Sequence, residues 1–350
     1  MIRTLWGFLV LIPGFLGQPD PTIVQLEPPE QGPKEPDSGK VKLMADGSVL
    51  IYSNTRIWRW SRTGALLGEF AGTSSTGFKS VIDCHFDPAN ALYWVIEYGE
   101  GNPVVFDESG SQAGVLKYMG FQGLDLPVFR KILPVGRRLF ALDLGGFDPW
   151  YNPGAPVLVE IGLQRDGDRW AVVQRGDHFQ RFSSQQIRFD ANFKLFWIVE
   201  DPYHENLYVM DQLTPVVFHY VPSQRNGWYS YELRPERIFP ALPHYRPPPN
   251  ALNYLALSKP EYLRWWFSWS RINGFYGLGD DFLIGYEVPD PKHPKRNLQA
   301  LQRTTRSGRS IGPVHLETGL LVGVYDEQAI LLFHTNGQAP FAYGLKRMSM

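Results

Sequence analysis

Hydrophobic residues recur along this chain with a two-residue period, in short runs separated by turn-forming residues. Six times between residues 43 and 322, an apolar residue is followed six positions later by a second one and two positions after that by a third. The triples are Leu43/Val49/Ile51, Phe86/Leu92/Trp94, Leu133/Leu139/Ala141, Phe189/Leu195/Trp197, Leu257/Leu263/Trp265 and Val314/Leu320/Val322. Each triple predicts a strand, a tight turn and a second strand, because alternation is typical of a half-buried strand.

Two of these segments resemble each other. Residues 86–97 and 189–200 share Phe, Asp, Leu, Trp and Glu at equal positions without a gap. A second signal comes later in the repeats, where Gly64, Gly110 and Gly337 each stand four residues after an aromatic residue. Glycine at such a position predicts a tight turn between the last two strands of a unit.

The triples begin 43, 47, 56, 68 and 57 residues apart. Units of about 40–60 residues with four short strands are typical of β-propeller blades, each of which buries its apolar face against the next blade. We therefore predict an all-β chain that forms a six-bladed propeller of four-stranded antiparallel blades. The fourth unit is overlong, and its segments 216–220 and 228–233 are either extra strands or part of a seventh blade. An apolar island at 22–26 is expected to close the ring beside residues 342–346.

Aromatic residues make up 14% of the chain, with 11 Trp, 17 Tyr and 22 Phe. This richness favours strands, and we interpret the tryptophans at 58, 60, 94, 197, 265 and 266 as packing between blades rather than as a cofactor site. Cys84, the single cysteine, excludes an intrachain disulfide, and its alternating context predicts a buried side chain.

The N-terminus predicts export. Residues 1–17 combine Arg3 with an apolar stretch of signal-peptide length that is too short to span a bilayer; the alternatives are a buried strand or an uncleaved anchor. Residues 18–39 contain six prolines and are expected to form an extended tether. The propeller domain is then expected over 40–350, in a periplasmic or secreted protein without a transmembrane segment in the mature chain.

The blade pattern over about residues 40–345 resembles the six-bladed β-propeller superfamily, the TolB-like and NHL-like group of bacterial exported proteins. The resemblance rests on the repeats alone, so it implies a fold and leaves the function open. Metal-dependent lactonases of the six-bladed class hold a cation on the axis with oxygen ligands.

Four of the six predicted second strands end at or near an acidic residue. If these ends converge on one central mouth, their carboxylates could recruit a cation such as calcium. The candidate metal ligands are Glu97, Asp143, Glu200 and Asp326. The alternative is that all four are solvated turn residues. His85 and His204 lie nearest to them in sequence and are expected to be packing or surface histidines.

The chain has 34 Lys and Arg against 35 Asp and Glu, so its net charge is −1 and no global field attracts nucleic acid. Residues 289–310 are locally basic and are expected to form a flap or a solvated loop. Gly-x-Ser-x-Gly, phosphate-loop and dinucleotide motifs are absent from the sequence.

Two functions remain open. The first is a non-catalytic, monomeric exported propeller that binds a protein or glycan of the cell envelope through its loop face and needs no cofactor. The second is a cation-dependent, lactonase-like hydrolase with an acidic axial site.

Overall fold

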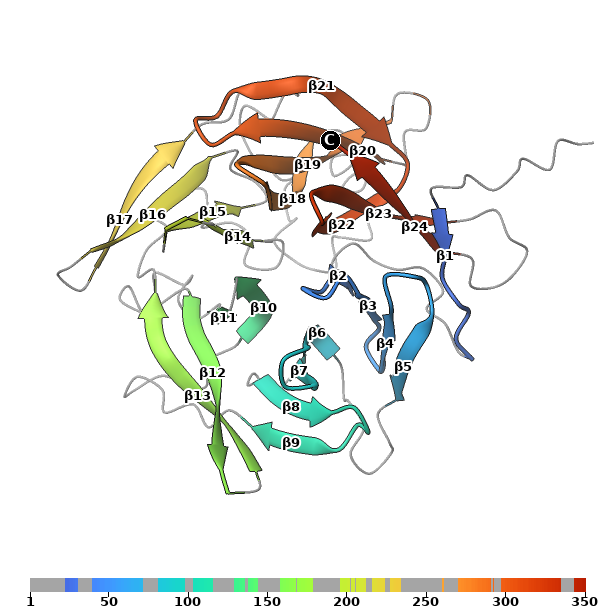
Figure 1. Ribbon diagram of the computed structural model, residues 1–350, viewed down its shortest axis with the longest axis vertical. Helices are drawn as coiled ribbons and strands as arrows, with labels where there is room; N and C mark the ends of the chain where they lie inside the picture. The colour runs from blue at the N-terminus through green and yellow to red at the C-terminus, as the bar shows by residue number, and fades with distance from the viewer. Residues whose placement is uncertain are drawn as a thin grey trace, which may run out of the picture.

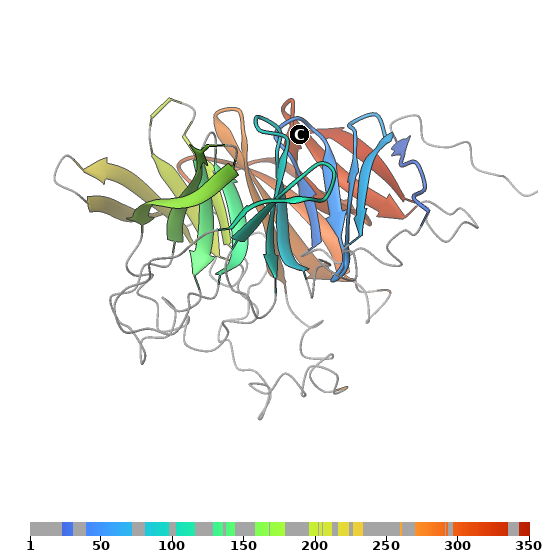
Figure 2. The same ribbon diagram turned by 90° about the horizontal axis from the view of Figure 1, so that it is seen from below.

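The structure of the chain is a computed structural model. The described residues are 23–30, 40–71, 81–97, 103–115, 129–135, 138–143, 158–167, 169–178, 196–201, 203–204, 206–211, 216–223, 227–233, 260, 270–290, 292, 297–334 and 343–350. They form six four-stranded antiparallel sheets, which are set around a common axis (Figure 1). Viewed from the side, the strands cross the thickness of the ring (Figure 2). The predicted β-propeller fold is therefore confirmed, while the blade count of the whole chain stays a prediction.

In five sheets, strand order follows chain order from the axis outwards. The first sheet comprises β2 (Val41–Leu43), β3 (Val49–Tyr52), β4 (Arg56–Trp60) and β5 (Leu66–Ala71). The second comprises β6 (Val81–Asp87), β7 (Leu92–Glu97), β8 (Pro103–Asp107) and β9 (Gln112–Val115). The third comprises β10 (Phe129–Val135), β11 (Arg138–Asp143), β12 (Leu158–Asp166) and β13 (Arg169–His178).

The fourth and fifth sheets follow the same order. The fourth comprises β14 (Phe196–Glu200), β15 (Leu207–Asp211), β16 (Val217–Ser223) and β17 (Gly227–Leu233). The fifth comprises β18 (Arg271–Leu278), β19 (Asp281–Pro289), β20 (Asn297–Thr305) and β21 (Ser310–Glu317). The segments considered for a seventh blade are thus the third and fourth strands of the fourth sheet, so that interpretation was wrong for them.

The last sheet joins the two ends of the chain. Its order is β22 (Leu320–Tyr325), β23 (Gln328–His334), β24 (Tyr343–Ser349) and β1 (Ile23–Gln25). Val24 pairs with Leu345, which confirms the predicted closing strand. β1 therefore belongs to the propeller although it lies within the predicted tether; residues 1–22 and 31–39 of the predicted signal peptide and tether lie outside the described residues.

A glycine permits this closure. Gly64 has a φ of +88°, and a Cβ added to it would lie 2.0 Å from the Gln25 carbonyl oxygen. The next residues of the N-terminal segment are held nearby, since the Trp60 indole donates to the Glu27 carbonyl at 2.8 Å. Gly64 and Gly110 both lie in turns between third and fourth strands, as predicted from their spacing after an aromatic residue.

Large aromatic side chains fill the spaces between sheets. Trp58 and Trp60 pack between the first and last sheets, Trp94 between the second and third, and Trp197 between the fourth and fifth. All four are at most 8% exposed, which confirms their predicted packing role. Cys84 is buried as predicted, and burial raises the pKa of its thiol.

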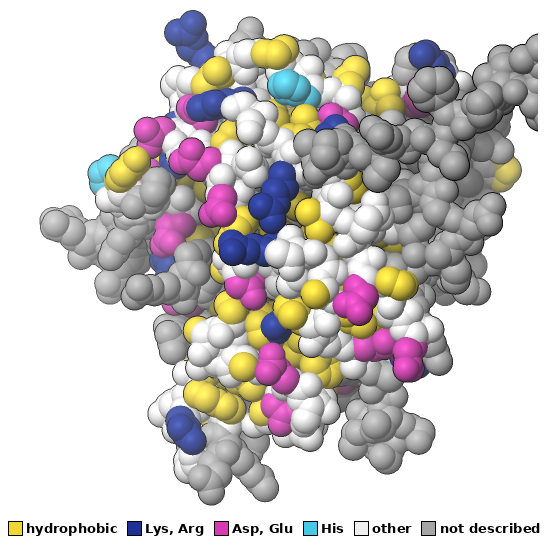
Figure 3. Space-filling model, turned by 45° about the vertical axis from the view of Figure 1, so that its right-hand side comes forward, with side chains coloured by type: hydrophobic (Ala, Val, Ile, Leu, Met, Phe, Trp, Pro, Cys, Tyr) yellow, Lys and Arg dark blue, Asp and Glu magenta, His cyan; other side chains and the backbone are white. Residues whose placement is uncertain are grey.

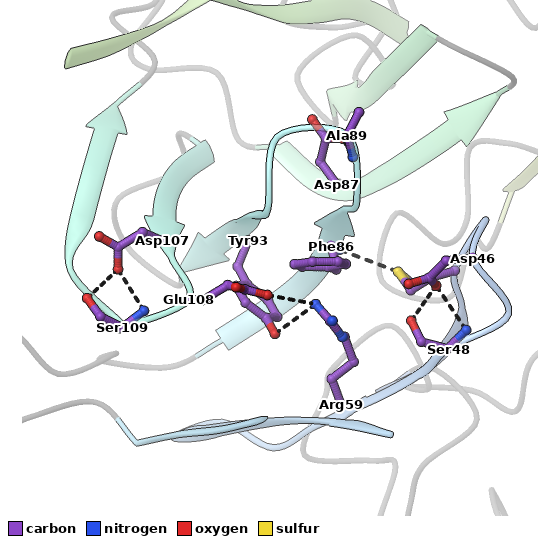
Figure 4. Close-up of polar contacts among 11 residues, drawn as sticks. Asp46, Ser48, Arg59, Phe86, Asp87, Ala89, Tyr93, Asp107, Glu108 and Ser109 are labelled. Carbon is purple, nitrogen blue, oxygen red and sulfur yellow. Dashed lines mark hydrogen bonds and ion pairs between the residues drawn. The ribbon is translucent and has the colours of Figure 1, made fainter. Parts of the chain in front are cut away.

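A guanidinium group adds a specific contact between the first two sheets. Arg59 of β4 lies over the Phe86 ring of β6, with its Cζ atom 3.6 Å from the ring centroid, and donates to the Tyr93 hydroxyl at 3.3 Å (Figure 4). Nearby turns are capped by aspartates. Asp46, Asp87 and Asp107 each accept a hydrogen bond from the backbone N–H two residues later, at 2.9, 3.0 and 2.9 Å (Figure 4).

The predicted strand pairs were right in the first half of the chain and displaced in the second half. The first three triples match β2–β3, β6–β7 and β10–β11. Val314, however, lies in the outermost strand of the fifth sheet, and Leu320 begins the innermost strand of the last one. Trp197 lies in an innermost strand, while Phe189, Leu257, Leu263 and Trp265 lie outside the described residues.

Candidate functional site

A cavity of about 410 Å³ lies where the innermost strands meet. Five of these strands line it: β2, β10, β14, β18 and β22. Figure 1 shows that they surround the middle of the ring. We call this space the axial cavity. Its position is common to propellers, but its side chains are set by the sequence of each inner strand.

A buried carboxylate stabilises one side of the axial cavity. Asp83 of β6, which is 2% exposed, accepts hydrogen bonds from Lys42 Nζ at 2.6 Å and from the Ile132 backbone N–H at 2.6 Å. Its second oxygen accepts from the Tyr52 hydroxyl at 2.6 Å. Lys42 Nζ also donates to the Ile132 carbonyl at 3.0 Å. Asp83 thereby joins three sheets, and the charge of Lys42 is neutralised.

Lys131, one residue before Ile132, also lines the axial cavity. The Lys42 amine forms an ion pair and hydrogen bonds, whereas the Lys131 amine forms neither with any of the described residues. Burial, together with the positive charge of Lys42, lowers the pKa of Lys131 to about 8, although Asp83 opposes this shift. At pH 7 the amine is still mostly protonated, so it is a positive charge available to a ligand.

Aromatic side chains stand opposite this charge. Lys131 Nζ lies 5.4 Å from the centroid of the Trp197 ring, within cation–π range. The Trp197 side chain is hydrogen-bonded to Tyr276, and burial raises the pKa of the Tyr276 hydroxyl. Within the part of the chain that the structure describes, the cavity therefore combines a cation that has no ion-pair partner with aromatic surface.

The remaining polar groups of the cavity are already paired. Glu200 accepts from Arg138 Nη2 at 3.1 Å. Asn273 and Gln299 exchange two hydrogen bonds between their amides, at 2.6 and 2.9 Å. Lys131 is consequently the polar group on which recognition of a charged ligand would depend.

The four predicted metal ligands do not share one face. Within each sheet the first and second strands are antiparallel, and the sheets repeat about the axis, so first strands end at one face of the ring and second strands at the other. We call the face that carries the turns between first and second strands the hairpin face. Glu97 and Asp143 end the second strands β7 and β11, whereas Glu200 ends the first strand β14.

Asp326 also lies at the hairpin face. It is an exposed residue of the β22–β23 turn, with a φ of +48°. The premise that all four acids end second strands was therefore wrong for Glu200 and Asp326. Among the described residues, no group of three or more His, Cys, Asp or Glu side chains is placed to hold a metal ion. Calcium binding stays a prediction of the sequence that this topology does not favour.

The basic segment 289–310 is not a flap where it is described, because it contains β20 of the fifth sheet. Arg303 pairs with Asp281 at 2.7 Å and Arg306 with Asp201 at 3.6 Å, so these charges are used within the fold. His85 is buried, as expected of a packing histidine, and His204 is exposed.

The outer surface carries no dominant charge on the side that Figure 3 shows. Basic and acidic side chains alternate there with hydrophobic ones, in agreement with the net charge of −1 (Figure 3). The described part of the chain contains no helix of the length and hydrophobicity that a membrane span requires.

Comparisons with known proteins support the fold. No protein family profile matches the chain, and no curated protein sequence matches it. Among solved structures, a candidate exported protein of Bacteroides fragilis is 9% identical, with a TM-score of 0.51 and coverage of 93% of both chains. A member of the DUF4221 family from Bacteroides vulgatus is 10% identical, with a TM-score of 0.52 and coverage of 93% of this chain and 91% of the other. At such identities the similarity shows the fold alone.

Proposed function

We propose that this chain is an exported, non-catalytic β-propeller that binds an acidic glycan, with one uronic acid residue of the glycan entering the axial cavity. Lys131 carries the proposal, because it is a cation without an acidic partner among the described residues in a cavity that also presents Trp197. A carboxylate would pair with the amine, and a sugar ring would pack against the aromatic surface. Export is supported by the pattern of residues 1–17 and by the likeness to a candidate exported protein.

Calorimetric titration of the full chain with glucuronate and with glucose tests this function. At pH 7 we expect glucuronate to bind at least about tenfold more tightly than glucose, since a charge-assisted hydrogen bond contributes about 1.5–3 kcal/mol. Lys131→Met should reduce glucuronate binding to the level of glucose. Lys292→Met, which removes an exposed lysine, is the matched control and should change nothing.

The proposal fails if neither sugar binds, or if Lys131→Met leaves the affinity for glucuronate unchanged. If peptides ending in Asp or Glu bind in a Lys131-dependent manner while glucuronate does not, the partner is a protein and the acidic-glycan assignment is wrong.

A further inference from the structure

The axial cavity carries a charged side chain toward each of its two ends. Lys131 is the first residue of β10 that lines it, and Glu200 is the last residue of β14 that does so. β10 and β14 are neighbouring first strands that run toward the hairpin face (Figure 1). Glu200 therefore lies at the hairpin face, and Lys131 lies farther toward the opposite face.

Both side chains face the gap between the third and fourth sheets. Side chains alternate along a strand, and Ile132 packs toward the second sheet. Lys131 consequently faces the other way, and its Nζ atom lies 5.4 Å from the centroid of the Trp197 ring in the fourth sheet. From the fourth sheet, Glu200 reaches back to Arg138 of the third. A single ligand in the cavity can therefore contact Lys131 and Glu200 together.

The spacing of the two charges is longer than one sugar ring. Glu200 follows Trp197, the neighbour of the Lys131 amine, by three residues, which is about 10 Å along a strand. A pyranose ring that pairs its carboxylate with Lys131 does not extend this far, whereas two linked rings do. The cavity volume of about 410 Å³ lies within the range of small-molecule sites.

Glu200 retains acceptor capacity for a ligand. Its Oε1 atom accepts from Arg138 at 3.1 Å, and no partner of its Oε2 atom is found among the described residues. A carboxylate has about four acceptor sites, so one contact with Arg138 leaves others open. The side chain is 33% exposed, which allows a ligand hydroxyl to reach it. A ligand carboxylate at the same place would meet a like charge, which is unfavourable.

We propose that the axial cavity takes a disaccharide unit, with a uronic acid at Lys131 and an uncharged sugar at Glu200. This inference rests on the proposed function and narrows it to glycans in which an uncharged sugar adjoins the uronic acid. Glu200 would be the specificity-determining residue, because it accepts from a hydroxyl group of the uncharged sugar and repels a second carboxylate.

Calorimetric titration of the full chain with two disaccharides tests the inference. Glucuronosyl-glucose and glucuronosyl-glucuronate differ only in their second ring, which carries a hydroxymethyl group in the first and a carboxylate in the second. At pH 7 we expect glucuronosyl-glucose to bind about tenfold more tightly than glucuronate, since it adds a hydrogen bond to a charged group. It should exceed glucuronosyl-glucuronate by about tenfold or more.

Substitutions of Glu200 assign this preference to one side chain. Glu200→Ala should reduce binding of glucuronosyl-glucose to the level of glucuronate, while glucuronate itself changes by no more than about twofold, because it binds at a distance from the substitution. Glu200→Gln keeps an acceptor oxygen and removes the charge, so the two disaccharides should then bind within about threefold of each other. Glu30→Ala removes an exposed acid of the N-terminal segment and is the matched control, which should change nothing.

The outcomes separate this inference from the proposed function. If glucuronate does not bind, or binds independently of Lys131, the proposed function is wrong and the disaccharide site with it. If glucuronate binds through Lys131, the disaccharide site alone is wrong when glucuronosyl-glucose gains nothing, when glucuronosyl-glucuronate binds equally well, or when Glu200→Ala keeps the preference. The two disaccharides decide the question on the unaltered chain even if Glu200→Ala does not fold.

Discussion

Two lysines line the same axial cavity on inner strands of different sheets, yet their surroundings differ. Lys42 of β2 lies 2.6 Å from the Asp83 carboxylate and also donates to the Ile132 carbonyl. Lys131 of β10 makes neither contact with the described residues. Its Nζ atom instead lies 5.4 Å from the centroid of the Trp197 ring. Among the described residues, an ion pair compensates the burial of Lys42, and none does so for Lys131. The difference separates a residue that stabilises the ring from one that is available to a ligand.

The largest effect is expected when Asp83 is replaced. Asp83→Asn leaves Lys42 without a counter-charge at a site where the two side chains are 13% and 3% exposed. Removing one partner of a buried ion pair costs about 3–5 kcal/mol, so the free energy of unfolding measured with urea should fall by that amount. The double variant Lys42→Met/Asp83→Asn should recover part of the loss, because it leaves no unpaired charge. A loss below about 1 kcal/mol for Asp83→Asn would contradict the structural role of this pair.

A smaller loss is expected from Tyr52→Phe. The substitution keeps the ring in the core of the first two sheets and removes only the hydroxyl that donates to Asp83 at 2.6 Å. A hydrogen bond to a charged group contributes about 1.5–3 kcal/mol, so the urea midpoint should decrease accordingly with an unchanged slope. Tyr203→Phe is the matched control, since its hydroxyl donates to Asp280 at the exposed surface. An equal decrease of the urea midpoint in both variants would show that the buried hydrogen bond to Asp83 contributes no more to stability than the exposed one to Asp280.

The sequence predicted the architecture because its hairpins are local. In the first three units, an apolar triple, an intervening turn and the next strand lie within about ten residues. In the first two of these units, Asp46 and Asp87 cap the turn through their own side chains. The prediction was wrong where the position of a strand in its sheet depends on pairing between segments that are far apart in the sequence. Residues 86–97 and 189–200 share a pattern, yet Trp94 lies in a second strand and Trp197 in a first strand. First and second strands both alternate with a period of two, so this pattern cannot distinguish one from the other.

The same ambiguity affects the candidate metal ligands. As second-strand residues, all four acids would meet at one mouth, but strand direction divides them between two faces. Lys131 was missed, although its sequence carried a signal. Lys131 stands two residues from both Phe129 and Leu133 in a predicted first strand, so a period of two places it on the same side of the strand as these apolar residues. Lys42 lies in another predicted first strand, directly between Val41 and Leu43, and only the folded ring shows that it pairs with Asp83.

The smallest effect is expected for Lys131→Met, and its sign distinguishes the two lysines. The pKa of Lys131 is about 8 in the folded chain and 10.5 for an ordinary lysine, so the unfolded chain binds more protons between these values. Stability contributed by Lys131 therefore rises with pH from about 8 to 10.5, with a slope of at most ~1.4 kcal/mol per pH unit. Lys131→Met should remove this rise and leave the protein at least as stable at pH 7, as measured by urea unfolding at several pH values. Lys292→Met should keep the rise. If Lys131→Met instead destabilises the protein at pH 7 as strongly as Asp83→Asn, then Lys131 is a structural cation like Lys42, and the axial cavity has no charge to offer to an acidic ligand.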